Sequence, residues 1–192
     1  YNIADHVVSV GVSVGIATVG HGEMDVDTIL KCADMALYGA KGKGRGRYCI
    51  FEPHMEAELK NRLKSEHDLK AALAQKEFRI VYQPLVDLAS EQVIGYEALL
   101  RWESATRGTV SPAEFIPLAE ELNMIGAIGA WCLEEACRSM VALPTDGKLA
   151  VNLSPVQLRN DEIVDVVRAA LTASGLDPAR LELEITESAL LE

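Results

Sequence analysis

Apolar and polar residues alternate along four segments in the second half of the chain, a pattern typical of half-buried β-strands. The four expected strands cover residues 78–88, 93–102, 148–154 and 180–187. In the second of these, every second residue from Ile94 to Trp102 is apolar. Glu97 and Arg101 lie on the other face, because successive side chains of a strand point to opposite sides.

Helical spacing of apolar residues predicts a helix or a helix pair between the later strands. The expected helices cover residues 112–122, 124–142 and 155–174. Helices between strands indicate a parallel sheet with right-handed crossovers, while the first two strands are close enough to pair as a hairpin. We therefore expect an α/β fold. An open doubly wound sheet and a (β/α)8 barrel both begin in this way.

The first 76 residues follow a different pattern. A strand is expected over about 6–19, followed by a helix over about 26–42 with Asp25 or Asp27 as its N-cap. The basic, glycine-rich stretch "AKGKGRGR" and a short strand "YCIF" come next, and Pro53 marks a boundary. A polar helix over about 54–76 then leads into the second half.

Composition excludes several classes of function. The formal net charge of −11 argues against a general binder of nucleic acid or of membrane surfaces, whose footprint is basic. Four cysteines without a CxxC pair and four scattered histidines give no zinc-ligand spacing. No apolar run is long enough to span a bilayer, so we expect a cytoplasmic location, with membrane anchoring by regions outside this sequence left open.

Polar side chains are expected to converge where the parallel strands end, as they do in the crevice of an open sheet or the mouth of a barrel. They are Gln83, Glu97, Arg101, Asn152 and Glu184. Two carboxylates and an amide oxygen repel one another unless a cation lies between them, and an all-oxygen set favours Mg²⁺ or Mn²⁺. Arg101 suits a phosphate oxygen. This set predicts metal-dependent phosphoester hydrolysis.

Each residue of this set also has an ordinary structural interpretation. A single glutamate on a strand is usually a rim residue or half of an ion pair, and Asn152, Ser154 and Pro155 together resemble the start of a helix. The hypothesis of a metal site therefore rests on the whole set.

Several motifs resemble those of the EAL domain family. They are "YQPLVDL", "VIGYEALLRW", "SPAEFIPLAEE", "VNLSPVQL" and "LELEITES", in that order, and Glu97-Ala98-Leu99 is the name-giving triplet. The resemblance implies a modified TIM (β/α)8 barrel that hydrolyses cyclic di-GMP to pGpG with Mg²⁺ or Mn²⁺. It also implies a homodimer formed through this domain.

The resemblance assigns roles by motif. Glu97, Asn152 and Glu184 resemble metal ligands, and Glu97 is the catalytic position. Gln83 and Arg101 resemble substrate contacts. Another position, Glu187, resembles a glutamate that stabilises the loop of the next metal-binding strand.

The first block resembles the end of a GGDEF domain, the α/β diguanylate cyclase fold. The matching stretches are "VSVGVSVGIA" and "ADMALYGAKGKGRGR", in which Lys41 and Arg45 resemble contacts to the triphosphate of GTP. Gly46 stands where that family commonly has Asn. Without the resemblance, "KGKGRGR" is an ordinary basic turn after a helix.

We therefore expect a fragment of a tandem GGDEF–EAL signalling protein. Its parts are the end of a GGDEF domain (1–53), a linker or first EAL helix (54–76) and the first half of an EAL barrel (77–192). Half a barrel has open sheet edges, so we expect this segment alone to be inactive and poorly folded. The leading hypothesis is cyclic di-GMP hydrolysis. The alternatives are an inactive module that binds cyclic di-GMP or GTP, and a net diguanylate cyclase.

Overall fold

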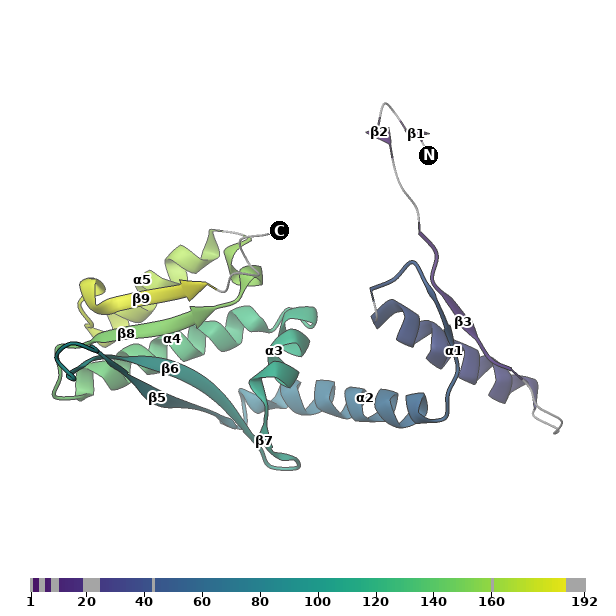
Figure 1. Cartoon of the computed structure of the whole chain (residues 1–192), viewed down its shortest axis with the longest axis horizontal. Helices are drawn as coiled ribbons and strands as arrows, with labels where there is room; N and C mark the ends of the chain where they lie inside the picture. Colours follow the sequence, from purple (N-terminus) through teal and green to yellow (C-terminus); the bar gives the residue numbers. More distant parts are fainter. Residues whose placement is uncertain are drawn as a thin grey trace. The chain divides into compact units, whose positions relative to one another are not determined.

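The computed structural model describes residues 2–3, 6–7, 11–18, 25–42, 44–159 and 161–185. The chain divides into two compact units, Tyr1–Lys64 and Ser65–Glu192. Each unit has its own helices and strands (Figure 1). No helix among the described residues is long and apolar enough to cross a membrane.

Two short parallel strands and a helix form most of the first unit. The strands are β3 (Val14–Ile16) and β4 (Tyr48–Ile50), and they contact helix α1 (Val26–Gly42). Asp25 is the N-cap of this helix, because its carboxylate accepts hydrogen bonds from the backbone N–H and the hydroxyl of Thr28 at 2.9 and 2.7 Å. The predicted helix is confirmed, and of the two candidate caps it is Asp25 that bonds the first turn.

The expected strand over 6–19 is wrong as one continuous element. Its first part contains β2 (His6–Val7), which pairs with β1 (Asn2–Ile3), and residues 11–13 are not in a strand. Strand structure resumes at β3, whose length matches that of its three-residue partner β4. Pairing rather than alternation therefore sets where this strand begins. Residues 8–10 and 19 lie outside the described residues.

Helix α2 (His54–Ala72) crosses the boundary between the two units. It ends four residues earlier than the sequence predicts. Lys76 has a positive φ of 56°, and its backbone N–H donates to the carbonyl of Leu73 at 3.2 Å. This left-handed residue closes a tight turn that cannot continue as helix.

The second unit is built on a five-stranded mixed sheet. Its strands are β5 (Phe78–Val86), β6 (Val93–Ser104), β7 (Gly108–Val110), β8 (Lys148–Leu153) and β9 (Leu181–Ile185). Their order is β5-β6-β8-β9, with β7 also paired to β6. The predicted hairpin of β5 and β6 is confirmed as an antiparallel pair, and β6, β8 and β9 run parallel as predicted. Strand β7 was not predicted from the sequence.

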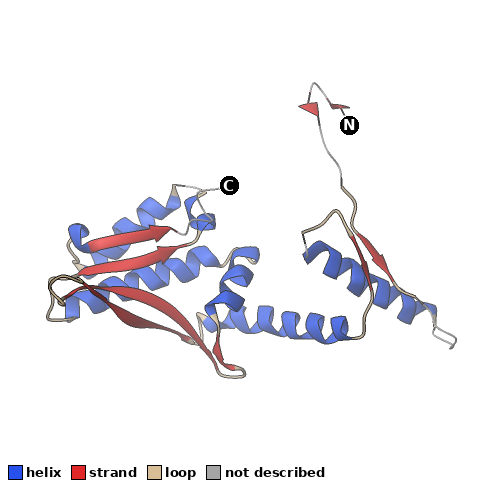
Figure 2. Ribbon diagram, viewed as in Figure 1, coloured by secondary structure: helices blue, strands red, loops and turns tan. Residues whose placement is uncertain are grey.

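Three helices accompany this sheet: α3 (Pro112–Glu121), α4 (Ile125–Ala142) and α5 (Glu162–Ser174). Figure 2 shows α4 and α5 beside the strands of the sheet, and these two helices contact each other. The helix expected over 155–174 is interrupted, because a separate turn of 3₁₀-helix, η1 (Pro155–Leu158), precedes α5. A second 3₁₀ turn, η2 (Pro178–Arg180), precedes β9.

The apolar face of the sheet packs against the helices as alternation predicts. Leu149, Val151 and Leu153 of β8 are at most 4% exposed and belong to one core cluster with residues of α4 and α5. A second cluster gathers aromatic rings around Trp102, including Phe78 and Phe115. The polar residues of the strands consequently lie on the other face of the sheet.

The cysteines are free, and three of the four are buried. Burial raises the pKa of the Cys132 thiol to about 12. Such a thiol stays protonated at neutral pH and is therefore unreactive.

The hydroxyl of Tyr82 on β5 is buried without a hydrogen-bond partner in the described part of the chain. Burial also raises the pKa of Tyr82, and the neighbouring side chain of Ser139 partly offsets this rise. An unsatisfied buried hydroxyl costs free energy, so we expect Tyr82→Phe to leave the free energy of unfolding unchanged or to raise it by about 1 kcal/mol. Urea denaturation of the full-length protein measures this difference. A loss of more than about 1 kcal/mol would mean that the hydroxyl is hydrogen-bonded after all.

Candidate functional site

The polar face of the sheet carries the predicted site residues on four strands. Gln83 on β5 and Glu97 on β6 are register partners, and Asn152 on β8 is the register partner of Glu184 on β9. Register partners on one face have their Cβ atoms about 5 Å apart. Since β6 also pairs with β8, the four residues form two neighbouring pairs on one face.

Glu97, Asn152 and Glu184 form the centre of the site. The side-chain amide of Asn152 donates a hydrogen bond from Nδ2 to Oε1 of Glu97 at 2.7 Å, across the boundary between β6 and β8. This bond leaves Oδ1 of Asn152 and the second oxygen of Glu97 available. Glu184, beside Asn152, is exposed, and its side chain has no ion pair or hydrogen bond among the described residues. The three side chains together present hard oxygen donors of the kind that Mg²⁺ and Mn²⁺ prefer.

Gln83 reaches this site by a route different from the predicted one. All the polar residues were expected at carboxyl-terminal strand ends, and this is wrong for Gln83 and also for Glu97, which lies in the middle of β6. Strand β5 runs antiparallel to β6, so Gln83 lies in mid-strand and faces Glu97 through cross-strand pairing. The hairpin brings it to the site because register, not strand direction, sets which residues are neighbours.

Arg101 lies on the same face as Glu97, as predicted, but not beside it. Four residues separate them, which is about 13 Å along a strand. The guanidinium is half-buried, and its one hydrogen bond within the described residues goes from Nη1 to the carbonyl of Leu100 at 2.9 Å. It therefore has donors left for a ligand.

A second arginine opposite Arg101 is already paired. Arg79 is the register partner of Arg101 and donates from Nη2 to Oε1 of Glu103 at 2.7 Å. The hydroxyl of Thr109 donates to the other carboxylate oxygen at 2.8 Å. The hydrogen bond from Arg79, followed by the one from Thr109, lowers the pKa of Glu103. Because Glu103 neutralises Arg79, Arg101 provides the positive charge that remains at this end of the face.

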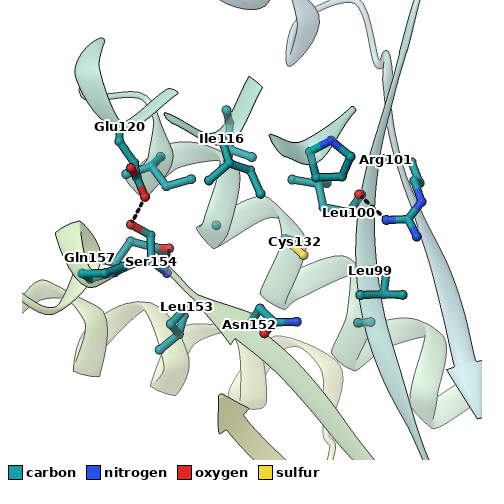
Figure 3. A pocket seen from close by; sticks show the side chains of 16 residues that line it. Leu99, Leu100, Arg101, Ile116, Glu120, Cys132, Asn152, Leu153, Ser154 and Gln157 are labelled. Carbon is teal, nitrogen blue, oxygen red and sulfur yellow. Dashed lines mark hydrogen bonds between the residues drawn. The ribbon is translucent and has the colours of Figure 1, made fainter. Parts of the chain in front are cut away.

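A cavity of about 360 Å³ lies beside the middle of β6 and the end of β8. Apolar side chains, including Leu100 and Ile116, line much of it, and Arg101 and Asn152 reach it from the sheet (Figure 3). Cavities of this size, mostly apolar with a few polar groups, are typical of small-molecule sites.

The sequence analysis missed three polar residues of this cavity: Glu120, Ser154 and Gln157. Glu120 follows Pro112 and Ile116 at intervals of four residues, so these three share one face of α3. That spacing is visible in the sequence and could have identified Glu120. Ser154 is the N-cap of η1, so the helix start suspected near Asn152 exists, while Asn152 itself belongs to the strand.

The structure does not place the three remaining predicted residues relative to this cluster. Lys41 and Arg45 belong to the first unit, where Arg45 has a positive φ of 56° between two glycines that also have positive φ. Glu187 lies outside the described residues. Among the residues that are described, no three His, Cys, Asp or Glu side chains form a metal-binding group, and the trio above contains only two carboxylates and an amide.

Comparison with known proteins identifies the family. Residues 66–192 match the EAL domain. The chain is 43% identical over 194 residues to the bifunctional diguanylate cyclase/cyclic di-GMP phosphodiesterase MucR of Pseudomonas aeruginosa, covering 98% of this chain and 28% of MucR. The chain spans about a quarter of the length of such relatives.

Solved structures agree with this result. The structure described as the PaMucR phosphodiesterase in complex with c-di-GMP superposes with a TM-score of 0.64 at 42% identity, covering 67% of this chain and 54% of that one. The FimX EAL domain of Xanthomonas citri, in complex with c-diGMP, gives a TM-score of 0.60 at 27% identity, covering 70% and 53%. The second unit therefore has an EAL-type α/β fold, part of a TIM barrel. This chain belongs to the EAL domain family.

Proposed function

We propose that the EAL segment is part of an enzyme that hydrolyses cyclic di-GMP to pGpG with a divalent cation. The observation that carries this proposal is the joint placement of Glu97, Asn152 and Glu184 on three neighbouring strands. The identity to MucR, whose name includes cyclic di-GMP phosphodiesterase, supports the substrate.

The chemistry of each side chain suggests its role in this proposal. Glu97, Asn152 and Glu184 would hold Mg²⁺ or Mn²⁺, which when bound supplies a Lewis acid for the phosphoester and lowers the pKa of water. Gln83, opposite Glu97, donates or accepts hydrogen bonds beside the same position. Because Glu97 is one of the proposed cation ligands, it is the residue to which we assign the catalytic role.

Arg101 and the cavity favour a ligand larger than a single phosphate. Arg101 lies about 13 Å along the strand from Glu97, so one ligand that meets both must extend between them. The fork of Arg101 suits a phosphate oxygen. The apolar walls of the cavity suit a planar base. A dinucleotide supplies both groups.

The test is a hydrolysis assay of the full-length protein with cyclic di-GMP, with and without Mg²⁺ or Mn²⁺. We expect pGpG to form with either cation and its formation to stop when EDTA removes the cation. A full-length protein that binds the dinucleotide without cleaving it would instead support the alternative of a regulatory binding module. Hydrolysis that continues in EDTA would contradict the metal role.

We also propose that the first unit is the end of a GGDEF domain. The alignment with MucR covers 98% of this chain and so includes this unit, and the name of MucR includes diguanylate cyclase. Lys41 and Arg45 are exposed and four residues apart around the turn after α1. They are candidates for binding the triphosphate of GTP. Equilibrium dialysis of GTP against the full-length protein tests this, with Lys41→Ala and Arg45→Ala expected to weaken binding.

Two further assignments stay predictions. Glu187 is expected to stabilise the loop that carries the next metal-binding strand end, and the EAL segment is expected to form a homodimer. Light scattering of the full-length protein measures the second directly.

A further inference from the structure

Ser154 is held from several directions where β8 leaves the sheet. Its hydroxyl donates to Oε1 of Glu120 at 2.6 Å and accepts a hydrogen bond from the backbone N–H of Val156 at 3.1 Å. Its own backbone N–H donates to Oε1 of Gln157 at 3.1 Å. Figure 3 shows Glu120 and Ser154 facing each other at one side of the cavity. This end of the strand is therefore fixed to α3 as well as to η1.

Glu120 depends on this contact. The carboxylate is half-buried at the cavity wall, and no lysine or arginine among the described residues pairs with it. A short hydrogen bond to a carboxylate is stronger than one between neutral groups. The bond to Ser154 is thus the main compensation for the partial loss of solvent around Glu120.

Helix α4 leaves room for the side chain of Gln157, which also bonds Ser154. A Cβ atom added at Gly129 would lie 2.2 Å from Nε2 of Gln157, far inside a normal contact. The absence of a side chain at Gly129 therefore lets Gln157 lie against α4 while its oxygen holds the backbone of Ser154.

The fixed end of β8 is two residues from Asn152. Val151 and Leu153, on either side of Asn152, are at most 4% exposed and pack in the core. Asn152 itself bonds Glu97 at 2.7 Å. The backbone of Asn152 is thus held by core packing on one face and by the contacts of Ser154 at the strand end.

We propose that Glu120 is a positioning residue for Asn152. By holding Ser154, it fixes the last residues of β8 so that the amide of Asn152 stays beside Glu97 and can serve as a cation ligand. This inference rests on the proposed function, because it assigns Asn152 a role in binding the cation. Partners of metal ligands commonly change metal affinity by 10- to 100-fold when removed.

The experiment measures Mn²⁺ affinity of the full-length protein by titration calorimetry, with thermal denaturation of each variant as a check on folding. We expect Glu120→Ala to weaken Mn²⁺ binding by roughly tenfold. Glu120→Gln keeps an oxygen that accepts from Ser154, so we expect its affinity to stay within about threefold of wild type. The control is Glu134→Ala, which removes an exposed carboxylate paired with Arg138 on α4 and should leave the affinity unchanged.

Unchanged Mn²⁺ affinity in a folded Glu120→Ala variant would overturn the inference, and so would an equal loss in Glu120→Gln. If Glu120→Ala does not fold, the pair Ser154→Ala and Ser154→Thr decides instead, because only threonine keeps the hydroxyl. The inference then requires weaker Mn²⁺ binding in Ser154→Ala and wild-type Mn²⁺ binding in Ser154→Thr. Failure of the wild-type protein to bind Mn²⁺ would overturn the proposed function itself, a different result from equal binding by wild type and variant.

Discussion

Replacing Glu97 with Gln is expected to lower the rate of cyclic di-GMP hydrolysis by at least about 100-fold. Removing a residue that only contacts a metal ligand already lowers metal affinity or activity by 10- to 100-fold, and Glu97 is proposed as a ligand itself. The substitution keeps the size of the side chain and removes its charge. It also keeps an oxygen that can accept from Asn152, so the bond of 2.7 Å can persist and the sheet should fold normally.

Two measurements separate catalysis from binding in this variant. Turnover is measured with Mg²⁺ present, and affinity for cyclic di-GMP is measured in EDTA, where we expect a change of less than about threefold. Glu182→Gln is the matched control. Glu182 lies on the same face of β9 as Glu184 but pairs with Lys148, so its loss should leave turnover nearly unchanged. Full turnover in Glu97→Gln would contradict its catalytic role.

Replacing Trp102 with Ala is expected to lower the free energy of unfolding by about 3–5 kcal/mol. Trp102 is 0% exposed, and its ring lies 5.8 Å from that of Phe115 and 6.1 Å from that of Phe78. Its indole N–H donates to Oε2 of Glu77 at 2.9 Å. The substitution therefore leaves a large cavity and removes one hydrogen bond of Glu77, which keeps the one from the backbone N–H of Ala105. Urea denaturation followed by far-ultraviolet circular dichroism measures the loss.

Trp102→Phe serves as the comparison, since it keeps an aromatic ring but loses the hydrogen bond to Glu77. We expect it to cost clearly less than Trp102→Ala. A loss below about 1 kcal/mol in Trp102→Ala would mean that the aromatic cluster contributes little to the stability of this unit.

Much of the second unit could be predicted because its signals are local. Alternation in β5, β6 and β8 separates the buried from the polar side chains, and the structure keeps that division, whereas Leu183 and Ile185 on the apolar side of β9 are exposed. The errors arise where strand pairing, rather than alternation along one strand, decides. The three-residue β7 exists because it pairs with β6, and the early strand is shortened because β4 offers only three partners.

The site shows the same limit. Glu97, Asn152 and Glu184 could be identified from strand faces and family motifs together, and they do lie side by side. The hydrogen bond between Ser154 and Glu120 could not be identified from the sequence, because it joins residues 34 positions apart on different elements. Alternation alone does not place Gln83 opposite Glu97; the antiparallel register of the predicted hairpin does.

The central claim is that Glu97, Asn152 and Glu184 together hold a divalent cation. Electron paramagnetic resonance of free Mn²⁺, titrated with the full-length protein, tests it most directly because bound Mn²⁺ leaves the free signal. We predict saturable binding that is weakened at least about tenfold in Asn152→Ala and Glu184→Gln and unchanged in Glu182→Gln. Binding of equal strength in wild type, Asn152→Ala and Glu184→Gln, or no binding by the wild type, would contradict the claim.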